Sequence, residues 1–199
     1  FEGSDILLII FVLTVATIFL VLSAYSSNSP YSAIGAQREL VLAMAYEPAI
    51  LIALAGVFHL TRSFNFYEII QQGKPLALYL PGMFVAIFLA LIVKLRKSPF
   101  DVSVSHHAHQ ELIGGFASDF SGRTLFMLEL ADWYEKVILL GLIFMLFSWN
   151  IPLAIVAVSL SYTLASIIDN STARLSWETS LGFLWAGTAM VAGCNLVIL

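Results

Sequence analysis

The stretch ILLIIFVLTVATIFLVLSA, residues Ile6–Ala24, is apolar from end to end and contains no charged residue. A helix needs about 20 predominantly apolar residues to cross the hydrocarbon core of a bilayer. In that environment the backbone polar groups must bond to one another, which an α-helix achieves within a single segment. The stretch therefore predicts a membrane-spanning helix, and it sets the fold class to be expected for the rest of the chain.

The composition of the whole chain agrees with this beginning. Of 199 residues, 60% are hydrophobic and only 11% are charged, whereas a soluble domain carries about 25% charged residues. A soluble enzyme and a disordered regulator are therefore disfavoured, and the net charge of −4 gives no sign of a nucleic-acid partner. We predict an all-α, polytopic transmembrane helix bundle in contact with membrane lipid, forming one domain over residues 1–199.

The other apolar segments set the expected number of helices. Together with the first, they predict about six spanning helices, near residues 6–24, 40–60, 76–93, 124–147, 152–168 and 180–199. Glu2 and Asp5 stand where a signal peptide would carry basic residues, so the first segment is not interpreted as a leader. The chain starts almost inside this helix, and we expect that an upstream part is missing.

Lysine and arginine residues indicate the orientation in the membrane. They are more frequent in the connections near residues 25–39, 94–123 and 169–179 than in the two other connections. Because basic residues are retained on the cytoplasmic side, we expect these three connections to be cytoplasmic and both chain ends to lie outside. The predicted location is the cell membrane, with an ordered cytoplasmic loop at about 94–123.

Charged residues inside the apolar segments are the first candidate site. Glu47 lies within the second segment, and Glu129, Asp132, Glu135 and Lys136 lie in the first half of the fourth. Asp132 and Lys136 are one helical turn apart and can pair. The group near the start of the fourth segment could be merely solvated at the membrane interface. The alternative is a relay that loads and releases protons, because ionisable groups inside membrane helices are costly and mark ion pathways.

The connection KLRKSPFDVSVSHHAHQELIGGFASDFSGR, residues 94–123, is too polar to span the membrane. It combines apolar residues for packing with acids and histidines, which predicts a docking surface or a cavity wall. The candidate residues of this loop are Asp101, His106, His107, His109, Glu111 and Asp119.

His107 and Glu111 in this loop are four residues apart and could share a ligand if helical. A second histidine at that spacing and a further ligand are absent, so we predict no metal site here. Proton exchange or hydrogen bonding by the imidazoles is expected instead.

Motifs for independent catalysis are lacking. The chain has a single cysteine, Cys194, and no Walker loop, dinucleotide fingerprint or CxxC pair. Iron–sulfur clusters normally need several thiolates, so we expect no cofactor bound by this chain alone and no active site of its own.

Two stretches resemble a known family. Residues 29–50 (SPYSAIGAQRELVLAMAYEPAI) and 97–122 (KSPFDVSVSHHAHQELIGGFASDFSG) are similar to the quinone-site membrane subunit of respiratory complex I. Three residues depart from that family's loop pattern: Lys97 stands where the family usually has arginine, Asp119 stands where it has glutamate, and His109 replaces an acidic residue. The SHHAHQEL version resembles the homologous subunit of Ech-type (group 4) energy-converting [NiFe] hydrogenases.

The resemblance implies a fold of about eight helices, of which this chain would hold the last six. It implies a non-catalytic subunit that anchors a peripheral redox arm and couples its chemistry to H+ or Na+ pumping. The partners would be the hydrogenase large and small subunits with Fe–S proteins, antiporter-like membrane subunits and, through the complex, ferredoxin. The Ni–Fe centre and [4Fe–4S] clusters would belong to those partners. Arg38, at the start of the motif's helix, would hold a carboxylate from the loop or the fourth helix.

Two alternatives remain open. The first is the quinone-binding membrane subunit of complex I, the NADH:quinone oxidoreductase. The second is a stand-alone secondary ion transporter, which would suit the intramembrane acids, although the chain shows no inverted repeat. Quinone-dependent, inhibitor-sensitive NADH oxidation by the purified complex would favour complex I. Co-purification identifies a transporter, which would come alone or as a homo-oligomer, whereas a coupling subunit would come with Fe–S proteins.

Overall fold

The computed structural model describes residues 5–27, 29–95, 120–172, 179–187 and 193. The helices are α1 (Ile6–Ser26), α2 (Pro30–Thr61), α3 (Phe66–Gln71), α4 (Leu76–Tyr79), α5 (Pro81–Lys94), α7 (Gly122–Leu146) and α8 (Ile151–Ser171). Residues 179–187 are also helical. Within these ranges the one β-type contact is an isolated bridge between Asp5 and Asn65. The prediction of an all-α membrane bundle is confirmed.

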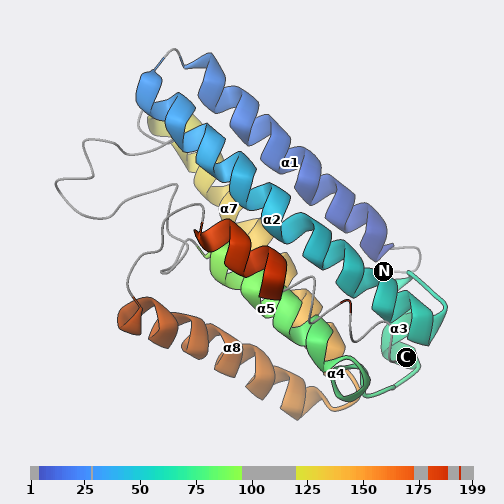
Figure 1. Cartoon of the computed structure of the whole chain (residues 1–199). Helices are drawn as coiled ribbons and strands as arrows, with labels where there is room; N and C mark the ends of the chain where they lie inside the picture. Colours follow the sequence, from blue (N-terminus) through green and yellow to red (C-terminus); the bar gives the residue numbers. More distant parts are fainter. Residues whose placement is uncertain (1–4, 28, 96–119, 173–178, 188–192, 194–199) are drawn as a thin grey trace.

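The long helices pack in a series (Figure 1): α1 contacts α2, α2 contacts α5, α5 contacts α7, and α7 contacts α8. The main apolar core lies among α2, α5 and α7, with the first turns of α1 joining it. Small residues permit close approach of α1 and α2, where Ala24 and Ala36 are almost fully buried. Small side chains at such crossings are typical of membrane helix pairs.

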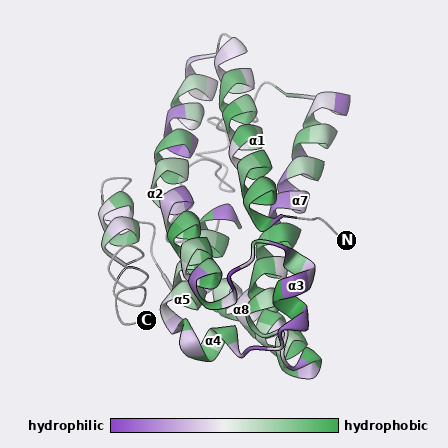
Figure 2. Cartoon of the chain, turned by 90° about the vertical axis from the view of Figure 1, so that its right-hand side faces the viewer, coloured by the Kyte–Doolittle hydropathy of each residue, from purple (hydrophilic) through white to green (hydrophobic). Residues whose placement is uncertain are grey.

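Three described helices are long and apolar enough to cross a membrane: α1, the part of α2 from Ser32 to Thr61, and α8. Hydrophobic residues cover most of the helices, and hydrophilic residues gather around α3 and the connections beside it (Figure 2). The helix α5 is also apolar but shorter. The helix α7 differs because its first fifteen residues carry five charged side chains, Arg123, Glu129, Asp132, Glu135 and Lys136.

The helix α2 begins ten residues earlier than the sequence predicted. Pro30 occupies its first turn, where the fixed φ of proline suits a helix and its missing N–H costs nothing. Arg38 and Glu39, expected in a cytoplasmic connection, therefore lie inside a helix. α2 has 32 residues and is therefore about 48 Å long. This length exceeds the thickness of the hydrocarbon core, which is about 30 Å.

The expected helix at 76–93 is divided instead into α4 and α5. Leu80, at φ −124° and ψ 55°, separates them, and Pro81 starts α5. The short α3 was not predicted, and Asn65 caps it by accepting a hydrogen bond from the Tyr67 backbone N–H at 3.0 Å. The loop residues 96–119 and most of the last expected helix lie outside the described residues.

Candidate functional site

The end of α5 defines the centre of the site. α5 has 14 residues, about 21 Å, and its last residue, Lys94, is only 8% exposed. The ammonium of Lys94 donates a hydrogen bond to Thr17 Oγ1 at 3.3 Å, and Thr17 lies near the middle of α1. The Lys94 side chain therefore reaches from the end of α5 to the middle of α1. Its positive charge lies at the C-terminus of α5, where the helix dipole favours a cation.

Two carboxylates from different helices face this ammonium. Glu135 of α7 pairs with Lys94 at 2.8 Å between Oε2 and Nζ, and Glu39 of α2 lies at 3.7 Å. The three side chains are between 7% and 14% exposed. Burying a charge is costly unless it is paired, and removing one partner of a buried pair leaves the other uncompensated. One cation thus holds three helices together at this point.

Thr17 and Tyr46 complete the surroundings of Lys94. Thr17 Oγ1 lies 3.5 Å from Glu135 Oε1, so one hydroxyl contacts both members of the pair. The Tyr46 ring centroid lies 5.1 Å from the ammonium, which is within the range of a cation–π interaction. The Tyr46 hydroxyl itself is buried and has no hydrogen-bond partner among the described residues.

A small cavity of about 20 Å³ adjoins this cluster. It brings Glu47 of α2 to the same space as Glu135 and Lys94. Its lining combines an apolar part with six polar residues, namely Thr14, Thr17, Tyr46, Glu47, Lys94 and Glu135. Glu47, which the sequence places inside the second apolar segment, therefore shares this cavity with the Lys94–Glu135 ion pair.

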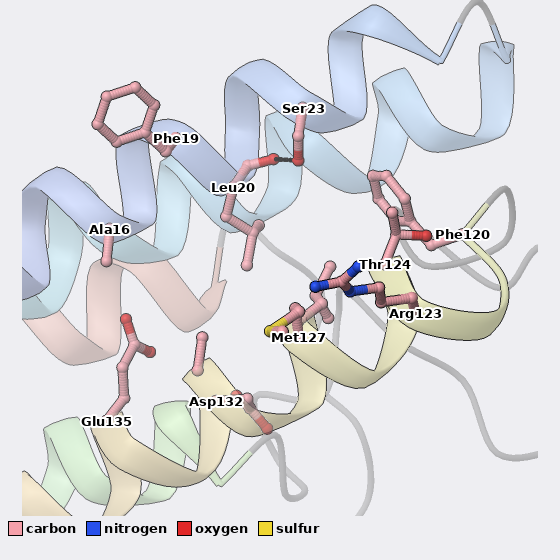
Figure 3. A pocket seen from close by; sticks show the side chains of 12 residues that line it. Ala16, Phe19, Leu20, Ser23, Phe120, Arg123, Thr124, Met127, Asp132 and Glu135 are labelled. Atoms are coloured by element: carbon pink, nitrogen blue, oxygen red, sulfur yellow. Dashed lines mark hydrogen bonds between the residues drawn. The ribbon is translucent and has the colours of Figure 1, made fainter.

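A second ion pair lies on α7 itself. Lys136 Nζ is 2.6 Å from Asp132 Oδ2, one helical turn away, as the spacing predicted. Asp132 also lines a larger cavity of about 470 Å³, for which α1 supplies one wall and the first half of α7 the other (Figure 3). Most of that lining is apolar, and Arg123, Asp132 and Glu135 are its charged members.

The sequence-predicted acids do not all meet in one place. Glu135 lines both cavities, Glu47 lines the small one and Asp132 the larger one. Glu129 is exposed on α7. Arg38 is exposed on α2, where it lines a further cavity of about 330 Å³ with Ile34, Gln37 and Val41.

The loop candidates Asp101, His106, His107, His109, Glu111 and Asp119 lie outside the described residues. The proposed contact between Arg38 and an acid stays a prediction. Within the described ranges, no group of three or more histidine, cysteine or acidic residues is placed to hold a metal ion.

Sequence reasoning missed Lys94 and Glu39 as site residues. It placed both at the edges of connections, because each directly adjoins an expected apolar segment. One signal was available: Lys94 follows thirteen residues of α5 without a charge, and a spanning helix needs about 20. A lysine so soon after Pro81 stays within the depth of the bilayer, and there it requires a partner.

The chain matches the model of the family described as NADH dehydrogenase over residues 2–199. It is 28% identical over 202 residues to an NADH-quinone oxidoreductase subunit of Dehalococcoides mccartyi, covering 97% of this chain and 56% of that protein. It is also 28% identical over 214 residues to the hydrogenase-4 component C of Escherichia coli, covering 95% of this chain and 66% of that protein.

A solved structure shares the fold. A chain of the archaeal membrane-bound sulfane sulfur reductase, a respiratory membrane complex, superposes with a TM-score of 0.83 at 21% identity, covering 98% of this chain and 68% of that one. This chain spans a little over half the length of its Dehalococcoides relative. The apolar helices and the family match indicate a multi-pass membrane protein. The chain belongs to the NADH dehydrogenase family, together with membrane subunits of complex I.

Proposed function

We propose that this chain anchors the peripheral redox arm of its complex to the membrane and couples the redox chemistry to ion translocation. The observation that carries the proposal is the buried Lys94 between Glu39 and Glu135. One ammonium facing two carboxylates leaves a formal charge of −1, which one proton neutralises. Such a cluster inside a helical bundle is typical of ion pathways rather than of structural packing.

The position of Lys94 in the chain supports the coupling. Lys94 is the last residue of α5 and Leu95 caps the helix. The sequence that follows carries the acids and histidines of the loop. A redox-driven movement of that segment would displace Lys94 relative to its two carboxylates. Because a charge moved within a low-dielectric site changes the protonation equilibria around it, the two sites would be energetically coupled.

For the parent complex we favour a ferredoxin-dependent, proton-reducing [NiFe] hydrogenase. The SHHAHQEL motif supports this branch, as do relatives that include the hydrogenase-4 component C and formate hydrogenlyase subunit 4 of Escherichia coli. The expected partners are the hydrogenase large and small subunits with Fe–S proteins, antiporter-like membrane subunits and ferredoxin. The Ni–Fe centre and [4Fe–4S] clusters are assigned to those partners and none to this chain.

The quinone-binding membrane subunit of complex I is the second candidate. It is favoured by relatives that are subunits of NADH-quinone oxidoreductases. A stand-alone transporter has less support, since the relatives are named as subunits or components of larger assemblies. In either complex the connection after α5 is proposed to face the cytoplasm, because its sequence carries the basic residues Arg96 and Lys97, and basic residues are retained on that side.

Purification of the intact complex through a tag on this chain tests the proposal. Co-purified Fe–S proteins and H2 formation from reduced ferredoxin would support the hydrogenase, and quinone-dependent, inhibitor-sensitive NADH oxidation would support complex I instead. Purification of this chain alone or as a homo-oligomer would contradict both.

Ion translocation is tested separately, in proteoliposomes, as ion uptake per turnover. Replacement Glu47→Gln keeps the side-chain volume and hydrogen bonding but removes the titratable group. We expect a lower uptake per turnover than in the wild-type complex. Unchanged ratios in Glu47→Gln and in Glu135→Gln would contradict the coupling role of this cluster.

A further inference from the structure

One face of α7 combines an acid with large apolar side chains that no described helix covers. Phe126, Trp133 and Val137 are 61%, 64% and 63% exposed, and Glu129 between them is exposed as well. Because these residues follow one another at spacings of three and four, they share one face of the helix. In Figure 2 the part of α7 that begins the helix stands at the edge of the bundle.

Neither lipid nor water suits this surface. If lipid covered it, the Glu129 carboxylate would lie among apolar side chains without water or a cation, which is costly. If water covered it, the neighbouring aromatic rings would remain exposed together, and apolar patches of this kind mark interaction sites. Tryptophan and phenylalanine are enriched in the cores of protein interfaces. The face therefore has the character of a contact with another protein segment.

Glu129 lacks a cation within the described part of the chain. It takes part in none of the ion pairs found there. Lys136 lies two helical turns further along the same face, but its ammonium is 2.6 Å from Asp132 Oδ2. Because that pair is neutral as a unit, the face keeps one uncompensated negative charge. A segment that covers the face must supply one positive charge, since ionisable groups within membranes are almost always paired.

The basic residues of this chain are engaged elsewhere. Lys94 and Lys136 already pair with acids. Arg38 and Arg123 each line a separate cavity. The other basic residues lie in the connections between apolar segments, and the last segment, residues 180–199, contains no lysine or arginine. Neither that segment nor a second copy of the chain therefore offers the missing cation at the depth of an apolar helix.

We infer that the face formed by Phe126, Glu129, Trp133 and Val137 docks a transmembrane helix of a partner subunit, and that this helix places a lysine or arginine against Glu129. The spacing of three and four suits a helix packed lengthwise on α7 at a small crossing angle, which is the common geometry of membrane helix pairs. The aromatic side chains pack on either side of the ion pair and exclude lipid from it. The inference rests on the proposed function in that the chain must be a subunit of a complex.

The first test is the density over this face in a cryo-electron microscopy map of the intact complex, purified through a tag on this chain. The inference predicts a partner helix along residues 126–137, with a lysine or arginine nitrogen within about 4 Å of the Glu129 carboxylate. Lipid, solvent, a second copy of this chain, another helix of this polypeptide or a partner helix without a basic residue in that place would overturn it.

The second test compares two exposed aromatic residues on different helices. Trp133→Ala removes a ring from the docking face, and Phe11→Ala removes one from α1, where Phe11 is 66% exposed. We expect retention of the partner subunit to fall about three- to tenfold in Trp133→Ala, as for a central interface residue, and to stay unchanged in Phe11→Ala. Equal retention in the two variants would overturn the inference.

The third test reverses the charge. Glu129→Lys places a cation against the partner's cation, and we expect at least about tenfold weaker retention, because like charges face each other in the contact. Glu68→Lys on α3, also exposed, is the matched control and should retain the partner. A glutamate in place of the partner's basic residue should restore retention in Glu129→Lys, and failure to restore it would overturn the ion pair.

The outcomes separate this inference from the proposed function. If the wild-type chain purifies alone or only with copies of itself, the proposed function fails. If the wild-type complex assembles and both Trp133→Ala and Glu129→Lys retain every subunit in full, the proposed function stands and the docking face is wrong.

Discussion

Two lysines pair with acids of α7, and their surroundings differ. Lys136 pairs with Asp132 on the same helix, and its side chain is 25% exposed. Lys94 comes from α5, is 9% exposed and faces acids from two other helices. The first pair closes one helical turn, while the second joins α2, α5 and α7 inside the bundle. Asp132 is itself buried, at 6% exposed, so the local pair contributes less to the fold than the cross-helix cluster but is not a surface pair. The cross-helix cluster is both a packing requirement and the candidate coupling site.

Replacing the lysine of each pair should give the largest difference in stability between the two pairs. We expect Lys94→Met to destabilise the protein by about 3–5 kcal/mol, because it leaves two buried carboxylates without their cation. Lys136→Met should cost less, about 1–3 kcal/mol, because the partly exposed Lys136 is one contact of the buried Asp132 carboxylate, whose side chain is 6% exposed. The measurement is the unfolding of each variant complex in detergent, with the yield of intact complex recorded beside it.

The same pair of variants contains its own control, since both substitutions replace lysine by methionine within the bundle. Equal destabilisation by the two would mean that burial does not distinguish the pairs. Lys94→Arg keeps the charge and should recover most of the loss if the charge is what matters.

The predictability of the two pairs from sequence follows the same division. The Asp132–Lys136 pair needs only the pitch of one helix, so spacing alone predicted it. The Lys94–Glu135 pair depends on where α5 ends along α1 and α7, which no local pattern contains. Apolar length predicted α1 and α8 closely, because the bilayer sets the length of such helices. Apolar length did not predict the first turns of α2, because α2 begins at Pro30 and its first ten residues include polar ones that precede the apolar segment.

Glu47 illustrates the limit of site prediction. Its place in an apolar segment marked it as a candidate, and the structure brings it to the small cavity. The residues that it meets there come from α1, α5 and α7, and their convergence depends on tertiary packing. Composition marks a buried acid as costly, but only the packing of the helices shows which group compensates it.

A double-mutant cycle should sharpen the contrast further. For Lys94→Met and Glu135→Gln we expect a coupling free energy of about 1–3 kcal/mol, as for contacting residues in one network. For Lys136→Met and Asp132→Asn the coupling should be smaller, about 0.5–1 kcal/mol, because Lys136 is partly exposed. The measurement is the unfolding of the wild type, the two single variants and the double variant of each cycle. Additive effects at Lys94 and Glu135 would contradict the ion pair.

Arg38 tests whether the exposed neighbour of Glu39 acts in assembly. Arg38→Leu removes a guanidinium that can bind a carboxylate with two hydrogen bonds, and we expect about tenfold weaker retention of partner subunits, equivalent to about 1.4 kcal/mol. Arg38→Lys keeps the charge but loses the two-pronged geometry, so it should recover retention only in part. The measurement is the amount of each subunit co-purified with this chain, and full retention in Arg38→Leu would remove Arg38 from the site.

The smallest effect is expected at Glu129, and it decides how far the relay extends along α7. Glu129 is exposed and lines neither cavity beside α7, whereas Glu135 lines both. Glu135→Gln should lower ion uptake per turnover, because it removes a titratable group in contact with Lys94. Glu129→Gln should change that ratio by less than about twofold, as expected for a surface substitution. Equal losses in the two variants would place Glu129 on the path, since an acid on that face conducts protons only where another subunit covers it and excludes lipid.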